Sequence, residues 1–215
     1  MNTASRAIDL MGIEADHIIL DLGCGDGYYS RLINQKTPRK LVDLDISHEN
    51  LRNLKQQSLR NISDRVANGY LYVCGDALHL PFPEHSFDRV VCSLVFYLVP
   101  LQPSLDELYR VLKPGGRSYL RLPMLAWNRV IDAFCQIPDL RRFLYCTNQL
   151  LNGLFFALAG KQIYNPFLRN DHWACYIPLK RFKVAVCHTG FQMEDLKIDY
   201  PRPGIPSIEA WVRKP

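Results

Sequence analysis

The feature that most constrains this chain is a glycine-rich turn between a strand and a helix near its start. Residues 19–29 read ILDLGCGDGYY, so an apolar run typical of a buried strand leads directly into Gly23, Gly25 and Gly27. A backbone approaches a ligand closely only where side chains are missing, and this order of strand, glycine turn and helix is the usual geometry for holding a nucleotide. The stretch predicts an α/β fold with a nucleotide-type ligand. The alternative is a tight turn without a ligand.

Two acidic residues make this turn unsuitable for a phosphate. Asp21 lies at the end of the strand and Asp26 lies within the turn, where carboxylates would repel a phosphate. The dinucleotide fingerprint also requires Gly or Ala at the position that Tyr28 occupies here. The ligand is therefore expected to be cationic. S-adenosylmethionine, which carries an ammonium and a sulfonium group, fits this expectation.

The ends of the next two strands supply further candidate contacts. Asp45 lies 22 residues after Gly23, where a carboxylate can accept hydrogen bonds from two ribose hydroxyls. It could instead cap the following helix, a role for which Ser47 competes. Asp76 follows the third strand, and the backbone of Ala77 could meet an adenine edge, although Asp76 could also be only a turn residue.

Strand and helix patterns alternate over most of the chain, which predicts a parallel sheet covered by helices on both faces. The segment PGG at 114–116 is expected to close a helix and re-enter the sheet. The expected strands are 17–23, 40–47, 69–77, 87–99, 116–123, 191–200 and 208–214. The expected helices are 3–12, 27–36, 48–60, 103–113 and 178–190.

Residues 124–178 interrupt this alternation after the fifth strand, at the carboxyl edge of the sheet where open α/β folds bind ligands. We interpret them as a substrate lid inserted into a single domain, 1–215. Aromatic side chains such as Trp127, Phe156 and Trp173 favour an apolar or aromatic acceptor, although many of them would simply pack within the lid. Alternatively, LLNGLFFALAG at 150–160 could touch a membrane surface, which would suit a lipid-soluble substrate.

Four ordered motifs over about residues 18–122 resemble those of the class I S-adenosylmethionine-dependent methyltransferases, in particular the small-molecule branch called type 11 or UbiE-like. The motifs are LDLGCGDG, DLDIS, GDALHLPFPEHSFDRVVCSLVFYLV and LYRVLKPGGR. The resemblance implies a Rossmann-like sheet of seven strands whose last strand, here 208–213, runs antiparallel. It also implies cofactor contacts at the methionine end (Asp21, Gly23, Gly25, Gly27), the ribose (Asp45), the adenine (Asp76, Ala77) and the sulfonium (Ser93). The candidate set is completed by the adjoining Cys24, Asp26, Ile46 and Leu94.

Methyl transfer from a sulfonium mainly requires alignment and desolvation of the acceptor, and a hydroxyl acceptor must also lose a proton. His172, beside Asp171, is a candidate base because an imidazole titrates near neutrality, although a surface or structural role is the alternative. Tyr97 is a second candidate. Enzymes that methylate exocyclic amines of bases resemble one another by a DPPY or NPPY segment, where this chain reads SLVFYLVP. We expect transfer to a hydroxyl or carbon of a small, fairly apolar metabolite, with S-adenosylhomocysteine as the product.

Composition and charge bear on the alternatives. The net charge of +5 is spread over small basic groups, which gives weak support to methylation of RNA or protein; a protein that only binds the cofactor is a third possibility. No apolar run reaches the roughly 18 to 20 residues of a membrane span. The seven cysteines show no regular spacing, and Cys24 and Cys92 are expected to be inert. We expect a cytoplasmic monomer or homodimer with a small-molecule acceptor, without a metal site or a nucleic-acid partner.

Overall fold

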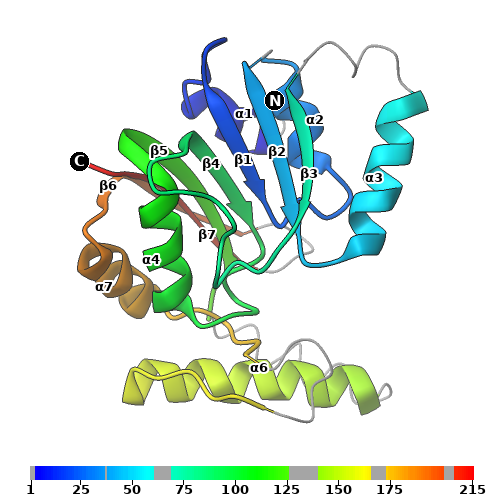
Figure 1. Cartoon of the computed structure of the whole chain (residues 1–215). Helices are drawn as coiled ribbons and strands as arrows, with labels where there is room; N and C mark the ends of the chain where they lie inside the picture. The colour runs from blue at the N-terminus through cyan, green and yellow to red at the C-terminus, as the bar shows by residue number, and fades with distance from the viewer. Residues whose placement is uncertain (1–2, 37, 61–68, 126–139, 166–172, 201–205) are drawn as a thin grey trace.

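One seven-stranded sheet forms the centre of the molecule (Figure 1). The computed structural model describes residues 3–36, 38–60, 69–125, 140–165, 173–200 and 206–215. The strand order is β3-β2-β1-β4-β5-β7-β6, and neighbouring strands are parallel except that β7 runs antiparallel to both β5 and β6. The Rossmann-like fold and its antiparallel last strand are therefore confirmed.

The strands form where near-continuous apolar runs predicted them. The first three strands end at an aspartate or directly before a glycine, which is where the chain leaves the sheet and where side chains become available for binding. The bounds are β1 Ile18–Leu22, β2 Lys40–Asp45, β3 Tyr70–Cys74, β4 Phe87–Ser93, β5 Leu112–Pro123, β6 Gln192–Asp199 and β7 Ser207–Arg213.

Helices cover both faces of the sheet, because successive side chains of a strand point to opposite faces. Ile19 on β1 packs with α1 and α2 through residues such as Ile8 and Ile33. Leu20, the next residue, belongs to the larger core that α4 and α7 complete from the other side, with Leu105 among its buried residues. The helices are α1 Thr3–Leu10, α2 Tyr28–Asn34, α3 His48–Arg60, α4 Leu101–Val111, α6 Leu140–Ala159 and α7 Leu179–Thr189.

Two boundaries differ from the prediction by more than three residues, the end of β4 and the start of β5. Strand β4 ends at Ser93 and does not continue to 99, because Leu94 adopts a left-handed backbone with φ of 59° and turns the chain out of the sheet. The PGG segment does not close a helix: α4 already ends at Val111, and residues 114–116 lie within β5. Gly115, with φ of 76°, lets this part of β5 bend.

The insertion predicted at 124–178 lies between β5 and α7, and its long helix α6 stands below the carboxyl edge of the sheet in Figure 1. Its two ends are tied together, since the backbone N–H of Leu125 donates to the Ile177 carbonyl and the N–H of Ile177 donates to the Pro123 carbonyl, both at 2.9 Å. Among the described helices, none combines the length and apolar character needed to cross a membrane. The lid role of this segment stays a prediction.

Candidate cofactor site

The register of the sheet brings the predicted cofactor residues to one edge. Leu22 of β1 is aligned with Leu44 of β2 on one side and with Cys92 of β4 on the other, and Asp45 is aligned with Cys74 of β3. The residues that follow these positions are therefore neighbours, because parallel strands end on the same side of a sheet. They include Gly23–Gly27, Asp45–Ile46, Asp76–Ala77 and Ser93–Leu94.

The glycine loop has a backbone that requires glycine. Gly23, Gly25 and Gly27 have φ values of 72°, 53° and 77°, all in the left-handed region. A side chain at Gly23 would collide with Val95, and one at Gly27 would collide with Leu54. At Gly25, in contrast, an added Cβ would meet no atom within 4 Å. The middle of the loop therefore borders open space.

Asp45 holds this loop from the neighbouring strand. Its Oδ2 accepts a 2.9 Å hydrogen bond from the backbone N–H of Gly25, and its Oδ1 accepts one of 2.8 Å from the N–H of Ser47. Ser47, and not Asp45, caps α3, since the Ser47 hydroxyl accepts a hydrogen bond from the N–H of Asn50. Ile46, the next residue along, is exposed. The helix-cap alternative for Asp45 is thus excluded, whereas its contact with a ribose stays a prediction.

Asp21 is turned into the protein and pairs with a second buried carboxyl group. The Ser30 hydroxyl lies 2.7 Å from Asp21 Oδ2 and 2.9 Å from Asp43 Oδ1, and Asp21 is only 2% exposed. One hydroxyl hydrogen can serve only one of these contacts, so the arrangement favours a proton on one carboxyl group. Burial raises the pKa of Asp21 to about 7, and burial together with Asp21 raises the pKa of Asp43 well above its usual range.

This burial limits what Asp21 can offer a ligand. The sequence predicted that the Asp21 carboxylate would face a cationic group, but a carboxyl group with a pKa near 7 is partly neutral at that pH. The exposed Asp26 is the other carboxylate of this loop, and its Oδ1 accepts a hydrogen bond from the N–H of Tyr28. Direct contact of either residue with the methionine end of the cofactor stays a prediction.

The segment after β3 contains a turn built by Asp76. Its Oδ1 accepts a 2.9 Å hydrogen bond from the N–H of Leu78, and its carbonyl accepts one from the N–H of His79. Ala77 is buried beneath this turn. Asp76 is thus a turn residue, which was the alternative role considered for it. Recognition of the adenine by this segment stays a prediction.

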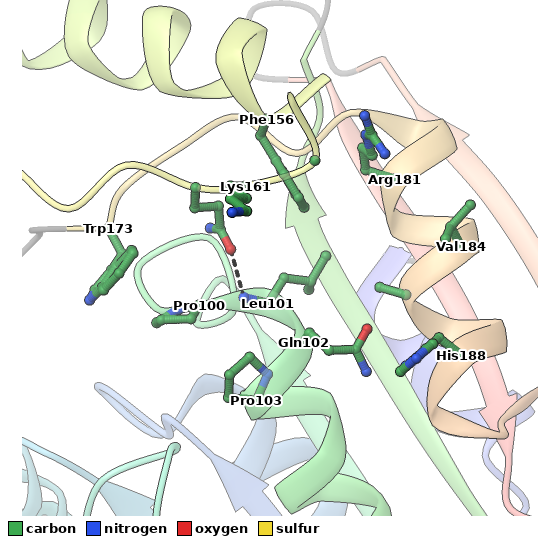
Figure 2. Close-up of a pocket in the computed structure, with 13 residues that line it drawn as sticks. Pro100, Leu101, Gln102, Pro103, Phe156, Lys161, Trp173, Arg181, Val184 and His188 are labelled. Atoms are coloured by element: carbon green, nitrogen blue, oxygen red, sulfur yellow. Dashed lines mark hydrogen bonds between the residues drawn. The ribbon is translucent and has the colours of Figure 1, made fainter. Parts of the chain in front are cut away.

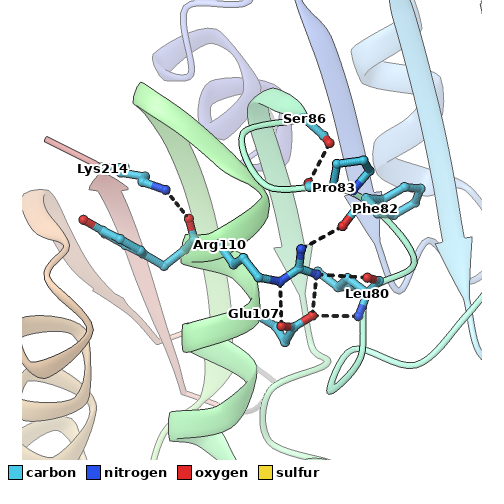
Figure 3. Close-up of polar contacts among 8 residues, drawn as sticks. Leu80, Phe82, Pro83, Ser86, Glu107, Arg110 and Lys214 are labelled. Carbon is cyan, nitrogen blue, oxygen red and sulfur yellow. Dashed lines mark hydrogen bonds and ion pairs between the residues drawn. The ribbon is translucent and has the colours of Figure 1, made fainter.

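A charged pair on α4 anchors the continuation of this segment, and sequence reasoning missed it (Figure 3). The Arg110 guanidinium donates to the carbonyls of Leu80 and Phe82 at 3.0 and 2.8 Å, and Glu107 accepts from both Arg110 and the N–H of Leu80. The hydrogen bond from Arg110 is the main cause of a lowered pKa for Glu107. The available signal in the sequence was the three-residue spacing of Glu107 and Arg110 on a predicted helix, because residues three apart lie on the same helix face and can pair.

The loop after β4 contains the remaining candidates. Ser93 is half-buried and Leu94 is exposed. The carbonyl of Tyr97 accepts a 2.9 Å hydrogen bond from the N–H of Cys175, so this loop also meets the end of the insertion. His172 lies outside the described residues. Cys24 and Cys92 are buried, and burial raises the pKa of both thiols, in agreement with the inert role predicted for them.

A pocket of about 510 Å³ lies on the α4 and α7 side of the insertion and includes none of the predicted site residues (Figure 2). Its apolar part comes from α4, α6 and Trp173, and its basic part comes from Lys161, just after α6, and from α7. Its lining includes Pro103, Phe156, Trp173, Lys161, Arg181 and His188. Phe156 and Trp173 are among the aromatic residues considered in the sequence analysis, but the pocket itself could not be predicted because its residues come from four separate segments.

Comparison with known proteins agrees with the fold and the motifs. Residues 20–120 match the type 11 family described as Methyltransferase domain. The chain is 34% identical over 115 residues to the ubiquinone/menaquinone biosynthesis C-methyltransferase UbiE of Escherichia coli O1:K1 / APEC, covering 51% of this chain and 44% of that protein. It is 35% identical over 100 residues to the mitochondrial arginine-hydroxylase NDUFAF5 of Homo sapiens, covering 46% of this chain and 26% of that protein.

The fold is also that of 1,6-didemethyltoxoflavin-N1-methyltransferase from Burkholderia thailandensis, solved with 1,6-didemethyltoxoflavin and S-adenosylhomocysteine. The TM-score is 0.66 at 14% identity, over 99% of this chain and 78% of that one. These findings confirm the resemblance: the chain contains a class I S-adenosylmethionine-dependent methyltransferase domain. The domain belongs to the type 11, UbiE-like branch of that class. The chain spans less than half the length of the two curated relatives described above.

Proposed function

We propose that this chain binds S-adenosylmethionine at the carboxyl edge of β1 to β4 and transfers its methyl group to a carbon or hydroxyl of a small, fairly apolar molecule. The observation that carries the proposal is the link between Asp45 and Gly25. It fixes a left-handed loop whose middle residue has no protein atom in front of it, so backbone is presented to a ligand.

The side chains along this edge suit the parts of the cofactor. The Asp45 carboxylate is an acceptor for ribose hydroxyls, since a carboxylate has more lone pairs than its present partners use. The exposed Ile46 and the half-buried Leu78 offer apolar surface for an adenine ring. Ser93 and Leu94 are the residues proposed for the methionine end.

S-adenosylmethionine supplies a methyl group bound to a positively charged sulfur, and S-adenosylhomocysteine is left after transfer. The task of the protein is then to align the acceptor and to exclude water. We assign the exclusion of water to the insertion, 124–178. The hydrogen bond between the N–H of Cys175 and the Tyr97 carbonyl supports this assignment, because it ties the insertion to the loop after β4.

A hydroxyl acceptor needs a base, and Tyr97 and His172 are the proposed candidates. Tyr97 is half-buried in the loop after β4, three residues after Leu94 in the chain. If Tyr97 holds the proton, Tyr97→Phe should lower kcat about 10²-fold or more while leaving cofactor affinity unchanged. Equal turnover by the variant would remove Tyr97 from the mechanism, and the same assay on His172→Gln tests the other candidate.

The apolar character of the acceptor is supported by the aromatic side chains of the insertion and by the relative UbiE, which is named as a C-methyltransferase of quinone biosynthesis. The decisive test is incubation with methyl-labelled S-adenosylmethionine and separate apolar, polar, RNA and protein fractions of a cell extract. Label should enter the apolar fraction. Label in RNA or protein would contradict the proposed acceptor class, and cofactor binding without labelling of any fraction would contradict methyl transfer.

A further inference from the structure

Helix α6 turns an apolar face away from the rest of the protein. Leu151 is 59% exposed and Leu158 is 85% exposed, and the exposed Leu144 and Phe155 lie on the same side. The intervals of seven, four and three residues place all four side chains in one stripe, because a helix repeats every 3.6 residues. A surface helix of a globular protein normally shows the opposite pattern, with its apolar stripe facing the core.

The inner face of α6 is partly polar and is the face that the protein holds. Asn152 is buried, donates to the carbonyls of Ile163, Trp173 and Ala174, and accepts from the N–H of Ile163. Gly153 lies so close to the Tyr176 carbonyl that a Cβ would come within 2.5 Å of that oxygen. These contacts fix the rotation of the helix about its axis, so the exposed stripe is a stable feature of the fold. In Figure 1, α6 is the outermost element on that side of the molecule.

Positive charge is concentrated along the part of the chain that begins with this helix. Residues 140–190 include seven of the 26 Lys and Arg residues and one of the 21 Asp and Glu residues. This segment therefore has a formal charge of +6, whereas the remainder of the chain has a charge of −1. An apolar helix face within a strongly basic segment is complementary to a surface whose outer layer is negatively charged and whose inner layer is apolar.

The basic side of the pocket in Figure 2 adjoins the end of the stripe. The Arg181 guanidinium donates to the carbonyls of Ala157 and Leu158 at 2.9 to 3.1 Å, so it lies at the carboxyl end of α6. Lys161 lies two residues beyond that helix end, and His188 lines the same pocket from α7. Cationic groups thus stand beside the most exposed leucine of the stripe.

We propose that these residues form a docking surface for an anionic lipid bilayer, called here the α6 surface: the stripe Leu144, Leu151, Phe155 and Leu158, together with Lys161 and Arg181. The helix would lie in the plane of the bilayer, with its leucines at the boundary between headgroups and acyl chains. A second copy of the chain is disfavoured as the occupant, because it would bring another segment of charge +6 to the contact. The inference stands apart from the proposed methyl transfer.

The test is co-sedimentation of the full chain with vesicles of phosphatidylcholine and with vesicles in which about a third of the lipid is phosphatidylglycerol. The wild-type chain should sediment with the anionic vesicles, less so with the neutral ones and less so at high salt. The double substitution Leu151→Gln and Leu158→Gln should weaken binding to anionic vesicles about tenfold or more. Leu10→Gln, which changes a 46% exposed leucine on α1, is the matched control and should bind like the wild type.

Both leucines of the double variant are exposed, so their replacement should leave the fold intact, and an unchanged calorimetric affinity for S-adenosylmethionine checks this directly. The proposal is overturned if the wild-type chain ignores anionic vesicles or if the double variant binds them as well as the wild type. It is also overturned if size measurements without lipid show a dimer that the double variant dissociates. Failure of the proposed function would appear separately, as absent cofactor binding with vesicle binding intact.

Discussion

Asp45 and Gly25, on adjacent strand ends, are joined by a 2.9 Å hydrogen bond from the Gly25 backbone N–H to the Asp45 carboxylate. The bond connects the loop after β1 to the end of β2 and holds the one loop glycine that borders open space. A loop fixed in this way is ordered before a ligand arrives, which reduces the entropy lost on binding. Asp45 positions the loop, and we propose that it also binds the ribose.

Replacement of Asp45 tests both tasks together. Asp45→Ala should weaken S-adenosylmethionine binding by about 1 to 3 kcal/mol, because hydrogen bonds to charged groups are of this size. Ser47→Ala is the control: it removes the cap of α3 and should cost about 1 kcal/mol of folding stability without changing cofactor affinity. Isothermal calorimetry and urea unfolding separate the two effects. Equal affinities for Asp45→Ala and the wild type would remove the ribose assignment.

Gly25 can be compared with a glycine of the same conformation elsewhere. Gly25→Ala and Gly12→Ala both place a side chain at φ values near 55° and should each destabilise folding by about 1 kcal/mol. Neither Cβ meets an atom closer than 3.6 Å. Only Gly25→Ala should also reduce cofactor affinity, since its methyl group enters the space proposed for the ligand. An equal loss of affinity in both variants would show that strain, and not occupancy of this space, is responsible.

The buried carboxyl pair predicts a stability that depends on pH. Burial raises the pKa of Asp21 from 3.8 to about 7 in the folded protein. The folded state then retains a proton that the unfolded state has lost, so the contribution of Asp21 to stability is fully present below about pH 4, falls between about pH 4 and 7 and is level above that range. Asp43 contributes in the same direction.

Between pH 5 and pH 8 the wild type should lose about 2 to 3 kcal/mol of stability through Asp21, because the pH rises by about two units before it reaches the pKa of this group. Asp21→Asn should not show this loss. Urea midpoints of the variant and the wild type at several pH values give this difference. Asp195→Asn, which changes an exposed carboxylate on β6, is the control and should leave the dependence of stability on pH nearly unchanged. A wild-type slope that persists in Asp21→Asn would show that Asp21 is not the source of this pH dependence.

The pair of Glu107 and Arg110 predicts a local effect on the segment after β3. Arg110→Lys keeps the charge but cannot reach the Leu80 and Phe82 carbonyls as a fork, so cofactor affinity should fall about threefold or more as this segment loosens. Arg117→Lys changes a comparable, partly exposed pair with Glu194 that touches no predicted site residue and should have little effect. Faster hydrogen exchange at residues 78–82 in Arg110→Lys alone would confirm the local cause.

The glycine loop and the ends of β1, β2 and β3 were predictable because each depends on a local pattern, a strand that ends in aspartate or is followed by glycine. The end of β4 was not, since Leu94 carries no local signal for its left-handed backbone and continues an apolar run. The PGG segment was misread for a similar reason: Pro and Gly stop a helix, but here the helix had already ended at Val111 and β5 absorbs them. In both cases tertiary pairing decided the boundary.

Contacts between distant elements could not be predicted from the sequence. The meeting of Asp21 and Asp43 across Ser30 depends on strand register, and the anchoring of the segment after β3 by Arg110 depends on the placement of α4. The outward stripe of α6 was visible only as an apolar run, because a run alone does not show which side the protein covers. Each of these features depends on how folding places one element against another.

The central claim is that this edge of the sheet accepts a nucleoside carrying a sulfonium. Calorimetric titration of the full chain with S-adenosylmethionine, and separately with NAD and ATP, tests it most directly. We predict saturable binding of S-adenosylmethionine that is weakened by Asp45→Ala, with no comparable binding of the two phosphate-bearing ligands. Binding of NAD or ATP with no response to S-adenosylmethionine would contradict the account.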